Sequence, residues 1–293
     1  MDLSVVVPTY RRPELLRRCL DSLRAQDVER DRFEVVVVDD GSGDSTAQVL
    51  NMFDVIGVVQ AENRGPAAAR NVGLATATGE LVLFLDDDVA AAPDLVSTHL
   101  RLHAQRDDPL LGVLGRVDWD PSLQVTNFMH WLDRSGLQFA YDTWLREGAV
   151  APPYAAFYTA NLSMHRALLA DVGGFDERFP YAAFEDIELA FRLAGRGFHL
   201  DYQPSAQAFH TRAIELEGFC RRMEKVGESA ELIRAAAPEF PLDDSTLTGI
   251  RTTSSQRLRL RVRAALGRHD AWNAYCWARV AAAYDGGRRR ARS

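Results

Sequence analysis

The sequence predicts an α/β fold, with a Rossmann-like, mixed and mostly parallel sheet flanked by helices. Two observations predict it. Short apolar runs of the length of buried strands alternate with amphipathic runs of helical spacing over residues 1–105, which is the pattern of a parallel nucleotide-binding sheet. One of these runs, residues 81–85, leads directly into three consecutive aspartates, so a buried strand delivers a cluster of carboxylates to one edge of the sheet.

The N-terminal half of the predicted catalytic domain, residues 1–105, contains four strands, each followed by a helix. Each strand is an apolar run too short for a surface helix. The strands are expected at residues 3–7, 33–38, 55–59 and 81–85. Pro13 and Pro66 stand where a first helical residue would, and Pro93 precedes the helix expected at 94–105. We assign this half to nucleotide binding.

The second half, residues 106–225, departs from this regular alternation. Residues 119–153 hold several aromatic side chains without a clean period, so they form a lid, a lining for a substrate, or a part of the core. Strands are expected at residues 111–117, 158–164, 198–202 and 206–210, and helices at 166–172 and 184–194. We expect this half to complete a binding site with the first half, and its substrate is considered below with the motifs.

Residues 226–293 are predicted to form a basic, mainly helical extension. The last 43 residues contain eleven arginines and two aspartates, whereas the chain as a whole carries a net charge of −7. Leu258, Val262 and Leu266 fit helical spacing, but the alternation of arginine and apolar residues around them also fits a strand. We expect a helix folded back on the acidic body, and a peripheral membrane contact or self-association through this extension stays open.

The composition indicates where in the cell the protein is expected and which kinds of site it lacks. No apolar run approaches the ~20 residues of a membrane span, and Pro8 interrupts the start before a signal-peptide core forms, so we expect a cytoplasmic protein, or one peripheral at the inner face of the membrane. Cys19, Cys220 and Cys276 have no CxxC spacing and suggest neither a disulfide framework nor a zinc site. We expect no nucleic-acid partner.

Acidic residues follow two of the predicted strands. Asp39 and Asp40 end the second strand, and Asp86, Asp87 and Asp88 end the fourth. Carboxylates accept hydrogen bonds from ribose hydroxyls or base N–H groups, and neighbouring carboxylates can hold a hard cation together with substrate phosphates. A solvated acidic loop is the commoner explanation of an isolated Asp-x-Asp. The functional interpretation is that these aspartates hold a metal ion and the diphosphate of a substrate.

Four further residues have both a functional and a structural interpretation. Glu185 and Asp186 begin a predicted helix, where the dipole favours anions by roughly 0.3–1 kcal/mol, and where a carboxylate can also serve as a general base. His210 ends a strand and can ligate a cation, although a lone histidine is more often a satisfied core or surface residue. Arg70 can reach the acidic strand end or a phosphate, or act as a structural ion-pair partner.

The loop after the first strand suits a nucleotide. Pro8, Thr9, Tyr10 and Arg11 offer backbone amides, an aromatic ring and a cation, although a surface turn with solvated arginines explains the same residues.

Seven motifs in order resemble those of the family 2 glycosyltransferases of the GT-A fold. Any one of them is weak, but their order over roughly residues 1–225 makes the resemblance specific. The motifs lie at residues 5–10, 38–42, 63–65 with 69–73, 84–88, 173–177, 185–189 and at His210.

The resemblance implies roles for the acidic residues. Asp40, with Asp39, would hold the base and ribose of a nucleotide near Thr9 and Arg11, and Asp86 would face the ribose or the sugar.

The same resemblance implies a metal site. Asp88 would bind a Mg2+ or Mn2+ ion that bridges the diphosphate, with Asp87 as a rival ligand, and His210 would complete the site.

The implied reaction is hexosyl transfer from a nucleotide-diphosphate sugar, with a UDP-sugar favoured, to an acceptor hydroxyl. Asp186, with Glu185 beside it, would act as the base while the hydroxyl attacks from the opposite face, so the product would be inverted. Asn161, Gly174 and Trp131 are expected to contact the acceptor, which the sequence does not identify.

Other functions fit parts of the sequence. A strand followed by Asp86 to Val89 also resembles haloacid-dehalogenase-like phosphatases, but Lys225, the only lysine, lacks their neighbouring acidic motif. A sugar nucleotidylyltransferase would have a glycine-rich loop near the start, and residues 8–13 contain no glycine. A non-catalytic nucleotide-sugar-binding protein would keep the binding aspartates and show no turnover.

Overall fold

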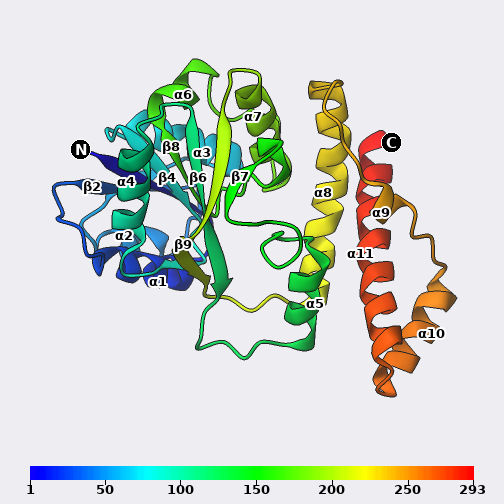
Figure 1. Cartoon of the computed structure of the whole chain (residues 1–293). Coiled ribbons are helices and arrows are strands. Elements are labelled where there is room, and N and C mark those ends of the chain that lie inside the picture. Colours follow the sequence, from blue (N-terminus) through cyan, green and yellow to red (C-terminus); the bar gives the residue numbers. More distant parts are fainter. The chain divides into compact units, whose positions relative to one another are not determined.

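A mixed sheet of nine strands forms the centre of the first compact unit, residues 1–125 and 136–213, in the computed structural model, which describes residues 1–293 (Figure 1). The strand order is β3, β2, β1, β4, β8, β6, β9, β5, and β7 pairs with β9. The strands are β1 Leu3–Thr9, β2 Phe33–Asp39, β3 Ile56–Val59, β4 Leu81–Leu85, β5 Val89–Ala91, β6 Leu111–Trp119, β7 Gly148–Val150, β8 Asn161–His165 and β9 His199–His210.

Strands β1 to β4 pair in parallel. β1, β2 and β4 carry almost uninterrupted buried runs, as is typical of strands covered on both faces, whereas β3 at the edge of the sheet is mostly exposed. Thr9 pairs with Asp39, so the carboxyl ends of β1 and β2 lie level at one edge of the sheet. Strand β8 then pairs antiparallel with β4, opposing Asn161 to Leu85. The Rossmann-like α/β fold that the sequence predicts is confirmed.

The helices of this unit are α1 Pro13–Arg24, α2 Thr46–Leu50, α3 Pro66–Thr76, α4 Leu95–Arg106, α6 Arg166–Asp171 and α7 Glu185–Ala194, with a 3-10 turn η1 at Pro153–Ala155. Proline opens α1 and α3, as expected. Helix α3 approaches the sheet closely at Gly73, where a Cβ atom would lie 2.4 Å from Cγ1 of Val6. Only a glycine permits this contact, which fixes the position of Arg70 one turn earlier.

The structure differs from the predicted elements in the second half of the chain. The two strands expected at 198–202 and 206–210 form the single strand β9, whose register with β6 shifts between Gly115 and Arg116. The short strands β5 and β7 have no counterpart in the prediction, because three residues are too few for a periodicity to show.

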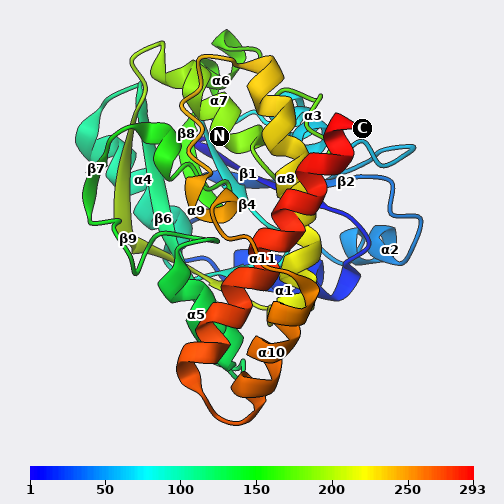
Figure 2. The same cartoon turned by 90° about the vertical axis from the view of Figure 1, so that its right-hand side faces the viewer.

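The second compact unit, residues 126–135 and 214–293, is helical. Its helices are α5 Asn127–Ser135, α8 Leu216–Ala236, α9 Ser245–Thr248, α10 Ser254–Ala265 and α11 His269–Arg292. Figures 1 and 2 show α8 and α11 side by side. A Cβ atom at Gly227 would lie 2.0 Å from the carbonyl oxygen of Tyr284, and one at Gly287 would lie 1.8 Å from that of Glu224. The two glycines let the helix backbones touch.

Ion pairs reinforce this contact between α8 and α11. Arg290 of α11 contacts Glu224 and Glu228 of α8, each at 3.0 Å, and Arg279 pairs with Glu217. The basic extension is therefore helical, and these acidic partners lie on α8.

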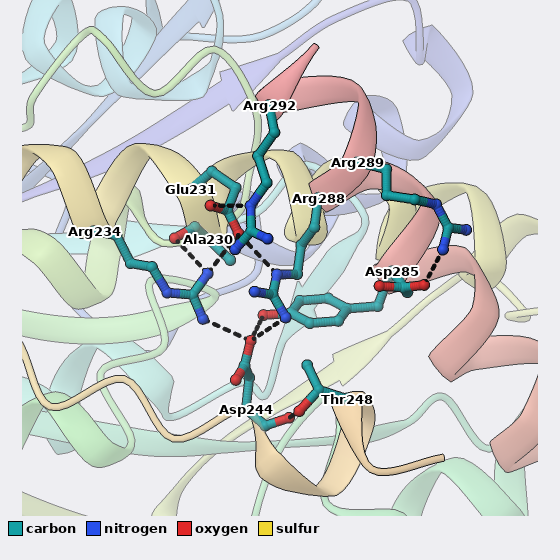
Figure 3. Close-up of polar contacts among 10 residues, drawn as sticks. Ala230, Glu231, Arg234, Asp244, Thr248, Asp285, Arg288, Arg289 and Arg292 are labelled. Carbon is teal, nitrogen blue, oxygen red and sulfur yellow. Dashed lines mark hydrogen bonds and ion pairs between the residues drawn. The ribbon is translucent and has the colours of Figure 1, made fainter. Parts of the chain in front are cut away.

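A network of hydrogen bonds and ion pairs joins the residue before α9 to the long helices α8 and α11 (Figure 3). Asp244, which precedes α9, accepts hydrogen bonds from Oη of Tyr284 and from Nη2 of Arg234, both at 2.7 Å. Arg288 lies 3.2 Å from the same carboxylate and donates through Nε to Glu231 at 2.7 Å. The network ties the loop before α9 to both α8 and α11.

The two compact units divide the chain differently from the predicted boundary after residue 225, which falls inside α8. The unit boundary follows Ala213, and α5 belongs to the second unit although it is encoded within the first. None of the helices combines the length and the apolar character needed to cross a membrane.

Candidate functional site

The acidic loop after β4 lies at the sheet edge where β1 and β2 also end, and Asp87 ties it to the loop after β1. Its Oδ2 accepts a hydrogen bond from Oγ1 of Thr9 at 2.8 Å, and its Oδ1 accepts one from Nη1 of Arg12 at 3.0 Å. Burial raises the pKa of the Asp87 carboxyl to about 6, although the Arg12 charge opposes this shift. Asp87 therefore holds the loop in place.

Asp88 is surrounded by cationic side chains. Its Oδ2 accepts hydrogen bonds from Nη2 of Arg212 at 2.8 Å and from Nη1 of Arg12 at 3.4 Å, and its Oδ1 lies 3.7 Å from Nδ1 of His210. Burial by itself would raise the pKa of Asp88, but the charges of His210, Arg12 and Arg212 together lower it. The carboxylate is thus held as an anion inside the fold.

Strand pairing places His210 beside Asp88, because Val89 of β5 is the register partner of His210 in β9. The imidazole ring lies between Trp119 and Phe139, with centroid distances of 5.6 Å to each. Nε2 of Gln138 lies 3.1 Å from Nε2 of His210, while the buried Oε1 of Gln138 has no hydrogen-bond partner. Half a turn of this amide would let Oε1 accept from Nε2–H and leave Nδ1 as a free ligand atom.

Arg70 connects the acidic strand end to the start of α7. Its Nη2 lies 3.1 Å from Oδ1 of Asp86, and its Nη1 donates to Oε1 of Glu185 at 2.8 Å. Arg70 and Glu185 are 3 % and 2 % exposed, so each needs the other's charge. Burial lowers the pKa of Arg70, but Glu185, Asp86 and Asp186 raise it above its ordinary value.

Asp186 is half-buried in the first turn of α7, next to Glu185. Its Oδ1 accepts a hydrogen bond from the amide of Ile187 at 2.8 Å. Burial raises the pKa of Tyr158, and the charge of Asp186 adds to this shift. Because the same charge acts on Arg70, Asp186 lies near the group that binds Asp86.

Asp39 and Asp40 hold loops in the structure. Oδ1 of Asp39 accepts from the amide of Ser42 at 3.0 Å. The two oxygens of Asp40 accept four hydrogen bonds, including those from the amides of Arg64 at 2.9 Å and Gly65 at 2.8 Å. These contacts fix the entry into α3, and Asp40 is 3 % exposed.

The loop after β1 combines anchored and exposed residues. Arg11 has a left-handed φ of 53°, and its amide donates to Oγ of Ser42 at 2.8 Å. Its guanidinium lies 5.1 Å from the ring centroid of Tyr10, which is exposed. Pro8 is half-buried and lies between the buried residues Val7 and Thr9 of β1. Tyr10 and Arg11 thus remain accessible beside the acidic edge.

Each of the three residues expected to contact the acceptor has a packing role within its own unit, and their contact with an acceptor stays a prediction. Asn161 is fully buried and donates through Nδ2 to the carbonyl oxygen of Ala206 at 2.9 Å. Gly174 has a φ of 70°, and a Cβ atom there would lie 2.5 Å from Oδ1 of Asn71. Trp131 is buried in the second unit, where its N–H donates to Asn273 at 2.8 Å. All three have packing roles.

Three residues beside Asp88 and His210 escaped the prediction, namely Arg12, Gln138 and Arg212. Arg12 follows Arg11 in the loop after β1, and nothing in the sequence indicates that Arg12, of the two exposed arginines, contacts Asp88. Arg212 stands two residues after His210, which is the one signal that could have marked it. Gln138 lies in a segment without periodicity, and no feature of the sequence distinguishes it.

The chain alone does not complete a metal site. No group of three or more histidine, cysteine, aspartate or glutamate side chains is arranged to hold a metal ion. Asp88 and His210 are a pair of buried, suitable ligands that lie together.

Comparison with known proteins places the chain among glycosyltransferases. It is 35 % identical over 223 residues to the validoxylamine A glucosyltransferase of Streptomyces hygroscopicus subsp. jinggangensis (strain 5008), covering 67 % of this chain and 52 % of the relative. It is 29 % identical over 245 residues to the pre-mycofactocin glycosyltransferase of Mycobacterium tuberculosis (strain ATCC 25618 / H37Rv), covering 81 % and 48 %. The chain thus spans about half the length of these curated relatives.

Solved structures share the fold. The mannosyltransferase PcManGT from Pyrobaculum calidifontis, in complex with GDP-Man and Mn2+, superposes with a TM-score of 0.63 at 20 % identity, covering 97 % of this chain and 86 % of that one. S. aureus TarS 1–349 in complex with UDP superposes with a TM-score of 0.60 at 21 % identity, covering 100 % and 91 %. The GT-A fold implied by the motifs is confirmed, and the comparisons give the phosphatase alternative no support.

The model of the family "Glycosyl transferase family 2" matches residues 4–163, which is more than half of the chain and includes the loop after β1, both acidic strand ends and Arg70. The chain belongs to glycosyl transferase family 2.

Proposed function

We propose that the protein transfers a hexose from a nucleotide-diphosphate sugar to an acceptor hydroxyl. The observation that carries the proposal is the Arg70 bridge, since one buried guanidinium contacts both Asp86 at the acidic strand end and Glu185 at the start of α7. The bridge draws together a candidate donor-binding edge and a candidate base, although 115 residues separate Arg70 from Glu185 in the sequence.

The donor is proposed to bind at the edge formed by the carboxyl ends of β1, β2 and β4. Tyr10 and Arg11 are accessible there for a base or a phosphate, and the loops held by Asp39 and Asp40 shape the same edge. We favour a UDP-sugar. S. aureus TarS forms complexes with UDP and UDP-GlcNAc, whereas PcManGT forms one with GDP-Man.

We infer that Asp88 and His210 hold a Mn2+ or Mg2+ ion when the donor is bound. The fit rests on an anionic carboxylate 3.7 Å from an imidazole nitrogen, both buried. Two protein ligands suffice if the diphosphate and water fill the remaining positions, as is usual for Mg2+. A bound ion would act as a Lewis acid for the departing diphosphate. Arg12 and Arg212, which contact Asp88, would then be available to the phosphate oxygens.

Asp186 is proposed as the general base. A half-buried carboxylate at a helix start can accept the proton of the acceptor hydroxyl as its oxygen attacks the anomeric carbon. Attack opposite to the leaving diphosphate would invert the configuration. Glu185, which is buried against Arg70, is a positioning residue for this turn of α7.

A thermal-shift experiment tests the donor and metal proposals together. UDP and GDP are each added with and without Mn2+, and a ligand at about 100 times its Kd should stabilise the fold by about 2.7 kcal/mol. We expect UDP with Mn2+ to raise Tm more than either alone. Asp88→Asn should abolish the increment that depends on Mn2+.

The proposal on donor binding is wrong if no nucleoside diphosphate shifts Tm. It is wrong only in its metal part if UDP shifts Tm equally with and without Mn2+.

The last part of the proposal concerns where the protein is located. We propose a peripheral association with the membrane through the basic C-terminal extension. The surface that supports this association is α10, whose exposed face is described in the next subsection.

A further inference from the structure

Helix α10 carries an exposed apolar stripe. Leu258, Val262 and Leu266 are spaced four residues apart and are 60 %, 53 % and 77 % exposed. Leu260 and Ala264, which are half-buried, lie on the opposite side of the helix, and α10 packs on α11. No residue of α10 is buried, so the stripe is not a core face that has lost its partner within the chain.

Arginines border this stripe on both sides. At about 100° per residue, Arg261 falls on one flank and Arg259 on the other. Neither side chain makes an ion pair within the chain, although the charge of Arg261 helps to lower the pKa of Glu217 on α8. Residues 251–269 contain six arginines and no acidic residue. The next acidic residue, Asp270, lies 3.7 Å and 3.6 Å from Arg263 and Arg268, so its charge is directed toward the end of α10.

We propose that this face of α10 docks on an anionic lipid surface. An amphipathic helix with leucine and valine on one face and arginines at its borders lies in the plane of an interface, where the apolar side chains enter the acyl boundary and the guanidinium groups meet lipid phosphates. The helix is formed before any such contact, because Thr253 and Gln256 close a reciprocal capping box at its start.

Charge distinguishes a lipid surface from a second copy of the chain. An isologous contact through the stripe would bring the two copies of Arg259 and Arg261 together around one apolar patch, and Glu217, the acid on which the charge of Arg261 acts, is already paired with Arg279. An anionic bilayer instead supplies opposite charge at both borders of the stripe. The inference does not rest on the transferase reaction.

Vesicle co-sedimentation of the full chain tests the proposal. The wild type should bind vesicles of phosphatidylcholine with phosphatidylglycerol, bind phosphatidylcholine alone weakly, and be released by salt. L258S/V262S/L266S should lower the partition coefficient for the mixed vesicles, and R259Q/R261Q should lower it as well, each by about tenfold or more.

Matched variants separate the stripe from general surface effects. M52S/I56S removes exposed apolar side chains of the first unit, and R101Q/R196Q removes exposed arginines there, so both should bind vesicles as the wild type does. Unchanged melting curves would show that all variants fold. Undiminished binding by the triple-serine variant would overturn the proposal. A wild-type dimer in light scattering that the triple-serine variant converts to a monomer would assign the stripe to a second copy.

Discussion

At the residue scale, three consecutive aspartates have three different environments. Asp86 pairs with a buried arginine, Asp87 has a pKa raised to about 6 by burial, and Asp88 has a pKa lowered by the cations around it. Their environments cannot be distinguished from three identical consecutive residues in the sequence. Their difference arises because each side chain leaves the strand end in another direction and meets other parts of the fold.

Asp186→Asn should lower kcat by a factor of about 10²–10⁴, because an amide cannot accept the acceptor proton. UDP affinity, measured by calorimetry, should change little since the side chain is isosteric. Asp171→Asn at the exposed end of α6 is the control and should keep full kcat. A loss of UDP affinity as large as the loss of kcat would show that Asp186 is not specifically the base.

Gln138→Leu should weaken Mn2+ binding by about 10–100-fold, because the imidazole of His210 would lose the partner that leaves Nδ1 free as a ligand. Gln138→Glu keeps an acceptor for Nε2–H and should bind Mn2+ more tightly than the leucine variant. Titration followed by the electron paramagnetic resonance of free Mn2+ measures this without turnover. Equal affinities of wild type and Gln138→Leu would rule the role out.

The residues of the site differ in how far the sequence reveals them. The aspartates and His210 follow apolar strand runs, so their positions can be read from the chain, whereas Arg12 and Arg212 acquire meaning only through Asp88, which lies 76 and 124 residues away. Gln138 depends on the packing of an aperiodic segment. Long-range contacts of single polar side chains leave no periodic signal in the sequence.

At the scale of elements, backbone contact decides how α8 and α11 pack. Gly227 and Gly287 face carbonyl oxygens of the opposite helix at distances that no Cβ atom allows. Glycine costs helix stability, so its presence here reflects the close approach of the two backbones.

Gly287→Ala and Gly286→Ala form a matched pair of changes on α11. At Gly287 the new methyl group would meet the carbonyl oxygen of Glu224, so we expect a loss of about 1–3 kcal/mol of unfolding free energy. At Gly286 the nearest atom is 3.9 Å away, so alanine should stabilise by about 0.5–1 kcal/mol. Thermal and urea denaturation measure both. Equal effects at the two positions would contradict the close contact.

Another element-scale feature is a buried hydrogen-bonded chain on α4 and β8. Nδ2 of Asn161 donates to carbonyl oxygens, so its Oδ1, 2.9 Å from Nε2 of His99, accepts a hydrogen bond from the N–H of that ring nitrogen. Nδ1 of His99 then accepts from Oγ of Ser163 at 2.7 Å, and Nε2 of His103 donates to the same oxygen at 2.8 Å. His99 is therefore neutral, with its proton on Nε2. His103 also carries a proton on Nε2, while its buried Nδ1 has no hydrogen-bond partner that would stabilise a second proton.

Acid should destabilise the fold through these two histidines. Burial lowers the pKa of His99 to about 4 and of His103 to about 3, against 6.5 for the free side chain. Between pH 6.5 and 4 the unfolded chain binds more protons, so stability should fall as pH falls, by about 1.4 kcal/mol per pH unit for each histidine. His103→Gln should reduce this slope in urea denaturation. An unchanged slope would contradict the assignment.

At the scale of the whole molecule, the sequence predicts the sheet better than the division of the chain. Regular alternation reveals β1 to β4, because each strand has a local apolar signal. The predicted boundary lies after residue 225, whereas the compact units divide after Ala213. The sequence cannot show that α5 packs with helices encoded about a hundred residues later, since its apolar face fits any partner.

A chain truncated after Ala213 should aggregate. It would expose the apolar face of α5, whose Phe128, Met129, Trp131 and Leu132 are buried in the second unit. Replacing these four residues by serine in the truncated chain should restore a monodisperse protein. Light scattering measures both, and a monodisperse truncated chain without the substitutions would show that α5 does not need the second unit.

The position of α5 also has a consequence for biosynthesis. Helix α5 ends at Ser135, but its partner α11 begins at His269. At about 5–20 residues per second, a ribosome needs roughly 7 to 27 seconds to make the intervening segment. During that time the apolar face of α5 has left the exit tunnel while α11 has not yet been translated. We expect this face to be a binding site for a chaperone.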